Sequence, residues 1–457
     1  MFKTLKGLRG KGPWKKGKER GVSREEKGRA IAWQRTLVLS LAVAILCTPV
    51  QAQTPPTPPP MVTVTLDQAV ELALKNNPTV GQAAQGILRA EGLLQQARSG
   101  AMPFASASVN GVLNSTERRF DDVVTSPRTQ AALTAQFGVP ILAASTWAAA
   151  AQARDQVEIQ YLSSIDVRTN VAVSTAQAYL AIIALKREVE VTQSAHQTSL
   201  AHLDYARRRL EAGAGTRVNE LRAGQEVSTV EARLETAQLG VRRAQEALGV
   251  LIVSDGPADA VVDPVFDLPP VVDEAGWMAV RPDLRLFTAQ ERAAERVWRD
   301  SSKDWFPTAV ASFDPQALVP ASIFTSAQSW RFGITFNQPL FDGGQRKGLR
   351  RVREANFIDT QLALTGLRTQ ARSEVRVAQD SVRSSERALA FLRSAANQAG
   401  EVLKITTFAF EAGATTNLEV IDAQRQARDA DTAAVIAEHA VRRSQLNLLT
   451  ALGRFPK

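Results

Sequence analysis

The feature that most constrains the fold is a duplication within the chain. The segment EAGAGTRVNELRAGQ, residues 211–225, recurs as EAGATTNLEVIDAQR, residues 411–425, at an offset of 200. Three further pairs occur upstream in the same order: RTNVAVSTAQAYLAIIAL with RSEVRVAQDSVRSSERAL, FGVPIL with FNQPLF, and NNPTV with VRPDL. Four matches in one order at nearly one spacing indicate a repeated unit. We therefore predict two repeats, 65–262 and 263–457, each built as helix, strand, loop, strand, long helix, turn, long helix.

Residues 1–52 are typical of a signal peptide. A basic stretch from Lys3 to Arg35 precedes the apolar run TLVLSLAVAILCTPV, and we expect cleavage after Ala52. The apolar run of about 14 residues is shorter than the roughly 20 that a membrane-spanning helix needs. The only cysteine, Cys47, lies within this segment and does not follow a small residue, so we expect no lipid attachment and no thiol in the mature protein.

The excess of positive charge is confined to the signal peptide. The chain holds 55 Lys and Arg and 46 Asp and Glu, of which 12 and 3 lie in residues 1–52. The remaining chain carries 43 of each and is neutral, so we expect no binding to nucleic acid. Beyond residue 52 no apolar run is long enough for a transmembrane helix, which leaves a periplasmic protein, a released protein or a β-barrel.

The segment after the signal peptide contains the sequence TPPTPPPM. Proline runs favour an extended chain, and we predict that residues 53–64 form a Pro-rich linker. Thr65 and Gln68 then fit a capping box, which predicts a helix that stops near Pro78.

Alternating apolar and polar residues predict strands in both repeats. In the second repeat the apolar positions are Trp330, Phe332, Ile334 and Phe336, and the first repeat has the same alternation in LTAQFGVPI. A soluble sandwich also has one apolar face, but four short strands in a helical chain cannot bury a core between them. Strands from several subunits closed into a barrel pair every edge and place the apolar face toward lipid. We therefore expect the four named residues to face lipid.

A second periodicity predicts a long helix from about Gly343 to about Phe410, roughly 100 Å in length. Its apolar positions recur at a mean spacing near 3.5, as in a coiled-coil seam. These positions are Leu364, Leu367, Ala371, Val375, Ala378, Val382, Leu389, Leu392, Ala396, Ala399 and Leu403. A fibrous coiled coil is the alternative, but Leu362, Val377 and Phe391 add apolar residues on other faces, which favours a wall of helices packed on both sides.

Taken together, these segments resemble the TolC-like outer-membrane efflux proteins over essentially the whole mature chain. The resemblance is carried by VTLDQAVELALKNNPTV, by QPLFDGGQRKG and above all by the duplicated glycine turn. It implies a mainly α-helical homotrimer with a twelve-stranded membrane β-barrel, four strands per protomer, and long coiled-coil hairpins. Such a protein lies in the cell outer membrane in contact with lipid and extends into the periplasm. It conducts substrates passively, with a periplasmic adaptor and an inner-membrane pump of RND or ABC type as partners.

The resemblance also implies roles for residues at the periplasmic tip. The hairpins would reverse at Gly213, Gly215 and Gly413, where the adaptor docks, and glycine tolerates positive φ there. Acidic residues six and nine positions after the second turn form rings at the entrance in this family. Glu419 and Asp422 occupy those positions, and the entrance should then favour cations. The alternative is that both are solvated helix carboxylates.

The chain departs from the family pattern at the groups that hold the tip closed. Asn219, with Glu220 beside it, stands where a gating aspartate is expected after the first turn. Phe410 and Thr415 stand in place of a tyrosine and an arginine. A closure built on hydrogen bonds from those groups cannot be the same here. We therefore expect a different closure, with a hydrophobic contact at Phe410.

The sequence shows no sign of an enzyme. It contains no Gly-rich phosphate loop, no metal-ligand cluster and no nucleophile with its base, and we expect no cofactor and no metal. The histidines of the mature chain are His196, His202 and His439, and the first two lie six apart, on different faces of a helix, so we interpret them as surface residues. A periplasmic or surface coiled-coil scaffold without a pore is the second hypothesis, and it leaves the alternating aromatic strands unexplained.

Overall fold

The structure is a computed structural model that describes residues 61–269, 273–321 and 326–455. The predicted signal peptide, with Cys47 and the cleavage site after Ala52, lies outside the described residues. Within the described part, no helix combines the length and the apolar character needed to cross a membrane.

The predicted linker ends earlier than expected. Residues 53–60 lie outside the described part of the chain, but Val62–Val64 form strand β1, which pairs in parallel with β6 (Ala258–Ala260). The prediction of a linker to residue 64 was therefore wrong at its end. The alternation of apolar and polar residues in MVTVT is short and directly follows the prolines, so it gave little indication of a strand. The strand with which β1 pairs lies almost 200 residues farther along the chain.

The first repeat follows the predicted plan with two additions. The capping box at Thr65 is present and opens the first helix. Pro78 does not end the helical region, because Asn77 caps a second helix with the proline at its first position. A small hairpin, β3 with β4, occupies the predicted loop. The elements are α2 (Leu66–Asn76), α3 (Pro78–Ser99), β2 (Phe104–Leu113), β3 (Arg118–Phe120), β4 (Val123–Ser126), β5 (Thr129–Ala143), α4 (Ala144–Glu211) and α5 (Arg217–Ile252).

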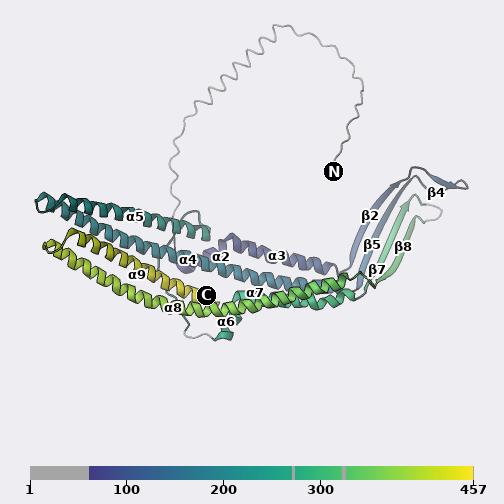
Figure 1. The fold of residues 1–457 in the computed structure, drawn as a ribbon. Helices are drawn as coiled ribbons and strands as arrows, with labels where there is room; N and C mark the ends of the chain where they lie inside the picture. The colour runs from purple at the N-terminus through teal and green to yellow at the C-terminus, as the bar shows by residue number, and fades with distance from the viewer. Residues whose placement is uncertain (1–60, 270–272, 322–325, 456–457) are drawn as a thin grey trace, which may run out of the picture. The chain divides into compact units, whose positions relative to one another are not determined.

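The second repeat has the same order of main elements. It contains α6 (Glu274–Val280), α7 (Pro282–Arg299), the short 3-10 helix η1 (Asp300–Trp305), β7 (Thr308–Val319), β8 (Gln328–Asn337), α8 (Gln345–Glu411) and α9 (Asn417–Ala451). Figure 1 shows the hairpins α4–α5 and α8–α9 running together away from the strands, with α4 in contact with α9.

The duplication extends to the contacts that fix helix ends. In the first repeat, Asn77 caps α3 and its side-chain amide donates to the carbonyl oxygen of Leu251 at 3.0 Å. In the second repeat, Arg281 precedes α7 and its guanidinium donates to the carbonyl oxygen of Ala451 at 3.3 Å. Both contacts satisfy carbonyls at the end of the closing helix that have no partner within that helix. The pairs NNPTV and VRPDL therefore occupy equivalent places.

The predicted coiled-coil seam packs as expected. Helix α8 runs from Gln345 to Glu411, and 67 residues at 1.5 Å per residue give about 100 Å. Every predicted seam position is buried or half-buried. Leu362, Val377 and Phe391 are instead 66%, 60% and 75% exposed, so α8 has a second apolar face that the protomer leaves open.

Two cores lie where the hairpins meet the shorter helices. In the first, Tyr179 and Ile182 of α4 pack with Leu248 of α5 against β1 and β6. In the second, Trp277 of α6 packs against the seam of α8 around Ala371. Each large apolar side chain buried in this way contributes about 1.5–3 kcal/mol. These cores hold the base of each hairpin.

The four main strands form one antiparallel sheet in the order β2-β5-β7-β8. The predicted apolar face is present, because Trp330, Phe332, Ile334 and Phe336 are between 62% and 72% exposed. Phe313 of β7 lies on the same face, with its ring centroid 6.1 Å from that of Trp330. Among the described residues, no element covers this aromatic surface, and β2 and β8 each have one edge without a partner strand.

Candidate functional site at the hairpin tips

The candidate functional site is the tip of the hairpins, which comprises residues 202–226 of α4 and α5 and residues 402–428 of α8 and α9. The predicted glycine turns are confirmed in geometry, with φ of +73° at Gly213 and +77° at Gly413. Each next helix begins at a threonine cap, since Thr216 accepts from the amide of Asn219 and Thr416 from the amide of Glu419.

Gly215 serves a different purpose from the other two glycines. Its φ is not positive, but a Cβ there would lie 2.9 Å from the backbone nitrogen of Leu210. Only glycine allows the chain to pass so close to the end of α4. The equivalent residue of the second turn is Thr415, so the two turns are not identical.

A buried polar contact joins the two hairpins at the tip. Nε2 of His202 on α4 donates to Oδ1 of Asn417 on α9 at 2.7 Å, and the Asn417 amide donates to the carbonyl oxygen of Asn219 at 3.4 Å. His202 is 7% exposed and Asn417 3% exposed. The interpretation of His202 as a surface residue was wrong. Burial lowers the pKa of His202, and the bond to Asn417 offsets this only in part.

Phe410 forms the apolar part of the same contact. It is 5% exposed, and its ring centroid lies 5.4 Å from that of His202 and 5.6 Å from that of Tyr205. The guanidinium of Arg209 lies 5.3 Å from the Phe410 ring, within the range of a cation–π contact. The sequence identified Phe410 but missed its partners, although the spacing of four between Tyr205 and Arg209 places both on one face of α4.

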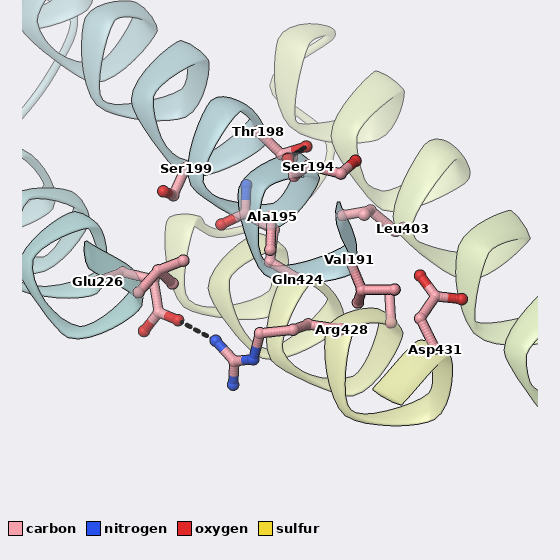
Figure 2. A pocket seen from close by; sticks show the side chains of 12 residues that line it. Val191, Ser194, Ala195, Thr198, Ser199, Glu226, Leu403, Gln424, Arg428 and Asp431 are labelled. Atoms are coloured by element: carbon pink, nitrogen blue, oxygen red, sulfur yellow. Dashed lines mark hydrogen bonds and ion pairs between the residues drawn. The ribbon is translucent and has the colours of Figure 1, made fainter. Parts of the chain in front are cut away.

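A buried ion pair crosses between the hairpins farther from the turns. Glu226 of α5 is 2% exposed and accepts from Arg428 of α9 at 2.9 Å and from Arg425 at 2.7 Å. Figure 2 shows the bond to Arg428 at the wall of a small cavity between the hairpins. Sequence reasoning missed this pair, because each residue taken alone looks like a solvated helix residue.

The predicted acidic residues differ in their surroundings. Glu419 and Asp422 are exposed and form no ion pair within the described residues, so their charge is not neutralised. Glu220 instead pairs with Arg217 and with Arg207. The Thr415 hydroxyl oxygen is buried without a hydrogen-bond partner in the described part of the chain. The structure thus brings Asn219, Phe410 and Thr415 together but leaves the acidic pair facing solvent.

No metal centre is evident at the tip. Among the described residues, no group of three or more His, Cys, Asp and Glu side chains could hold a metal ion. The tip is instead a set of contacts between two helical hairpins.

Solved structures define the class to which this fold belongs. The outer membrane protein VceC of Vibrio cholerae superposes with a TM-score of 0.73 at 20% identity, over 85% of this chain and 96% of that one. The fold is therefore that of the TolC-like outer-membrane channels.

Sequence comparison then gives the family. The model of the outer membrane efflux protein family matches residues 69–252 and 278–454, one segment in each repeat, and the chain belongs to that family. It is 26% identical to the outer membrane protein OprJ of Pseudomonas aeruginosa over 80% of this chain and 79% of that protein. It is 24% identical to the cobalt-zinc-cadmium resistance protein CzcC of Cupriavidus metallidurans, over 79% and 83% respectively. The protein is an efflux channel of the outer membrane that extends into the periplasm, and its family is one of transport channels.

Proposed function

We propose that three copies of the chain assemble into a passive export duct. The observation that carries this proposal is the open sheet, whose edges at β2 and β8 are unpaired and whose aromatic face is exposed. In lipid every backbone group needs an internal partner, which only a closed barrel provides for strands. Three sheets of four strands make a twelve-stranded barrel, with Trp330, Phe332, Ile334 and Phe336 in contact with outer-membrane lipid.

The helices continue the same assembly below the membrane. The second apolar face of α8, with Leu362, Val377 and Phe391, is open in the protomer and would be covered by a neighbouring copy. Twelve long helical segments then form a tunnel through the periplasm. The seam within each hairpin and the second face between hairpins are what a wall packed on both sides requires.

The resting state of this duct is closed, and its closure depends on contacts between the two hairpins of a protomer. Phe410 against His202 supplies the apolar contact in place of the hydrogen-bonding groups that the family pattern leads one to expect. The bond from His202 to Asn417 and the Glu226–Arg428 pair add polar contacts between the same hairpins. For the tip to open, α8 and α9 must move together relative to α4 and α5, which breaks all three contacts.

The entrance selects weakly by charge. Three copies of Glu419 and of Asp422 would surround the axis, and rings of carboxylates favour cations over anions. Their exposure and lack of ion pairs support this role, since a neutralised carboxylate contributes little field. The selection of cargo belongs to the pump, because the duct discriminates only by size and charge.

The proposed partners are those with which outer membrane factors of this family work. The turns at Gly213, Gly215 and Gly413 form the docking surface for a periplasmic adaptor, which links the duct to an inner-membrane pump of RND or ABC type. In this proposal the energy for export comes from that pump. The neutral mature chain gives no basis for binding nucleic acid.

Planar lipid bilayers test the proposal directly. The purified protein should run as a detergent-stable trimer and show discrete ion conductance, which should rise in the Phe410→Ala variant. A trimer that never conducts, even in that variant, would refute the duct. A scaffold without a barrel should also wash off membranes in alkaline carbonate, whereas the proposed channel should remain in the membrane pellet.

A further inference from the structure

A cavity of about 340 Å³ lies between the two glycine turns of the tip. It is lined by the end of α4, the start of α5, the end of α8 and the start of α9. Both hairpins therefore contribute to its wall. It is separate from the smaller cavity beside Glu226, although Phe410 and Asn417 of the proposed closure form part of its wall.

The charged side chains that line this cavity are both basic. Arg209 lies against the Phe410 ring, and the one hydrogen bond that its side chain makes among the described residues is a long one, 3.4 Å, to the carbonyl oxygen of Ala214. Arg222 makes no hydrogen bond or ion pair within the described residues. The lining that the structure describes includes no carboxylate, and the nearby Glu220 is already paired with Arg207 and Arg217. Two guanidinium groups thus reach one cavity without an acidic partner.

A hydroxyl group of the cavity also lacks a partner. The Thr415 hydroxyl oxygen is buried and forms no hydrogen bond in the described part of the chain. The oxygen is closed to solvent as the side chain stands, so a rotation about χ1 must turn it into the cavity before it can donate to a ligand. A hydroxyl donates readily to an anionic oxygen.

The helix dipoles reinforce the positive potential. Helices α5 and α9, of 36 and 35 residues, both begin at this cavity and belong to different hairpins. The N-terminus of each helix carries a partial positive charge and amide groups that are free to donate. The potentials of the two helices add to those of the arginines.

We propose that this cavity is a binding site for an oxyanion, a carboxylate or phosphate group, held by Arg209, Arg222 and Thr415. Guanidinium groups bind such groups through paired hydrogen bonds, and the hydroxyl supplies a further donor. An anion at this place contacts both hairpins of the protomer. The site is a property of the tip itself and does not rest on the proposed conduction, so a protein that fails to conduct can still bind.

Calorimetric titration of the purified full-length mature protein in detergent tests the site with two probes. Inorganic phosphate represents a free oxyanion, and N-acetyl-aspartate amide represents a carboxylate presented by a protein. We expect saturable binding of at least one probe, with one site per protomer. If only phosphate binds, the ligand of the site is a free oxyanion. If only the aspartate derivative binds, the ligand is a carboxylate group of a protein.

Variants separate a specific site from diffuse charge. Arg222→Gln should weaken binding about tenfold or more without affecting folding, because Arg222 has no partner to lose. Arg243→Gln makes the same charge change on α5, 21 residues or about 30 Å away, and should bind like the unaltered protein. Thr415→Val, which leaves the net charge unchanged, should also weaken binding.

Two results would overturn the proposal. One is the absence of saturable binding for both probes at low ionic strength, where charge attraction is strongest. The other is an equal affinity in Arg222→Gln and Arg243→Gln, which would mean attraction by net charge only. If Arg222→Gln fails to form a trimer, the Thr415→Val variant decides in the same way.

Discussion

Replacement of Glu226 by glutamine should loosen the tip more than any other single charge change between α5 and α9. Glu226 is 2% exposed and Arg428 6% exposed, so the substitution leaves a buried guanidinium without its main partner. Breaking a buried ion pair from one side costs about 3–5 kcal/mol. We expect the lower end, about 3 kcal/mol, because Arg428 keeps Asp429 at 3.1 Å.

Amide hydrogen exchange measured on the intact protein can read this effect locally. Amides of α5 and α9 near Glu226 should exchange more than a hundredfold faster, because 1.4 kcal/mol corresponds to a factor of ten. Arg425→Gln is the matched control, since Arg425 contacts the same carboxylate but is 45% exposed, and its loss should cost about 1 kcal/mol or less. The double variant Glu226→Leu with Arg428→Met should recover most of the loss.

The reasoning fails if Glu226→Gln and Arg425→Gln accelerate exchange equally, or if neither does. Equal effects would mean that burial does not set the energy of this contact. Exchange at the bases of the hairpins, around Tyr179 and Trp277, should stay unchanged in every variant.

Three further predictions concern the same tip. Phe410→Ala should cost about 3–5 kcal/mol of local stability and raise the conductance of the channel. Phe408→Ala on the same helix should do neither, because that ring is 74% exposed in the protomer. Bilayer recordings and exchange measurements on both variants make the comparison. Because burial lowers the pKa of His202 below its ordinary 6.5, the folded tip favours the neutral ring. The stability that the neutral ring contributes is present above pH 6.5 and is lost as the pH falls through the folded pKa. Protection factors at the tip, corrected for the pH dependence of intrinsic amide exchange, should therefore fall from pH 7.5 to 5.5, and should fall less in His202→Gln. Glu419→Gln combined with Asp422→Asn should lower the preference of the channel for cations, measured as a smaller reversal potential in a salt gradient. An unchanged reversal potential would refute the proposed role of these two residues at the entrance.

Most of the fold could be predicted from patterns within short segments of the sequence. The glycine turns, the capping box at Thr65 and the seam through Ala371 depend on residues close together in the chain, and such spacings are visible in a sequence. The duplication then supplied the order of elements, because each repeat supports the assignment of the other. For this reason the bounds of α8 were predicted to within two residues.

The contacts between hairpins could not be predicted in the same way. His202 meets Asn417 across 215 positions, and Glu226 meets Arg428 across 202. Nothing near any of these residues distinguishes it from an exposed polar residue on a helix. Phe410 was identified only by comparison with a family pattern, and its partners required the packing of α4 against α8 and α9. The strand β1 was missed for a similar reason, since its partner lies far along the chain.

The unpaired edges of the four-stranded sheet affect how the protein assembles. Until it meets other copies, each newly exported chain carries two rows of unpaired amide and carbonyl groups beside an aromatic surface. Such edges attract any extended chain, so a solitary copy is prone to aggregate. In the proposed trimer these edges are paired and this surface is covered only when copies meet, so we expect assembly to depend on the concentration of unassembled chains.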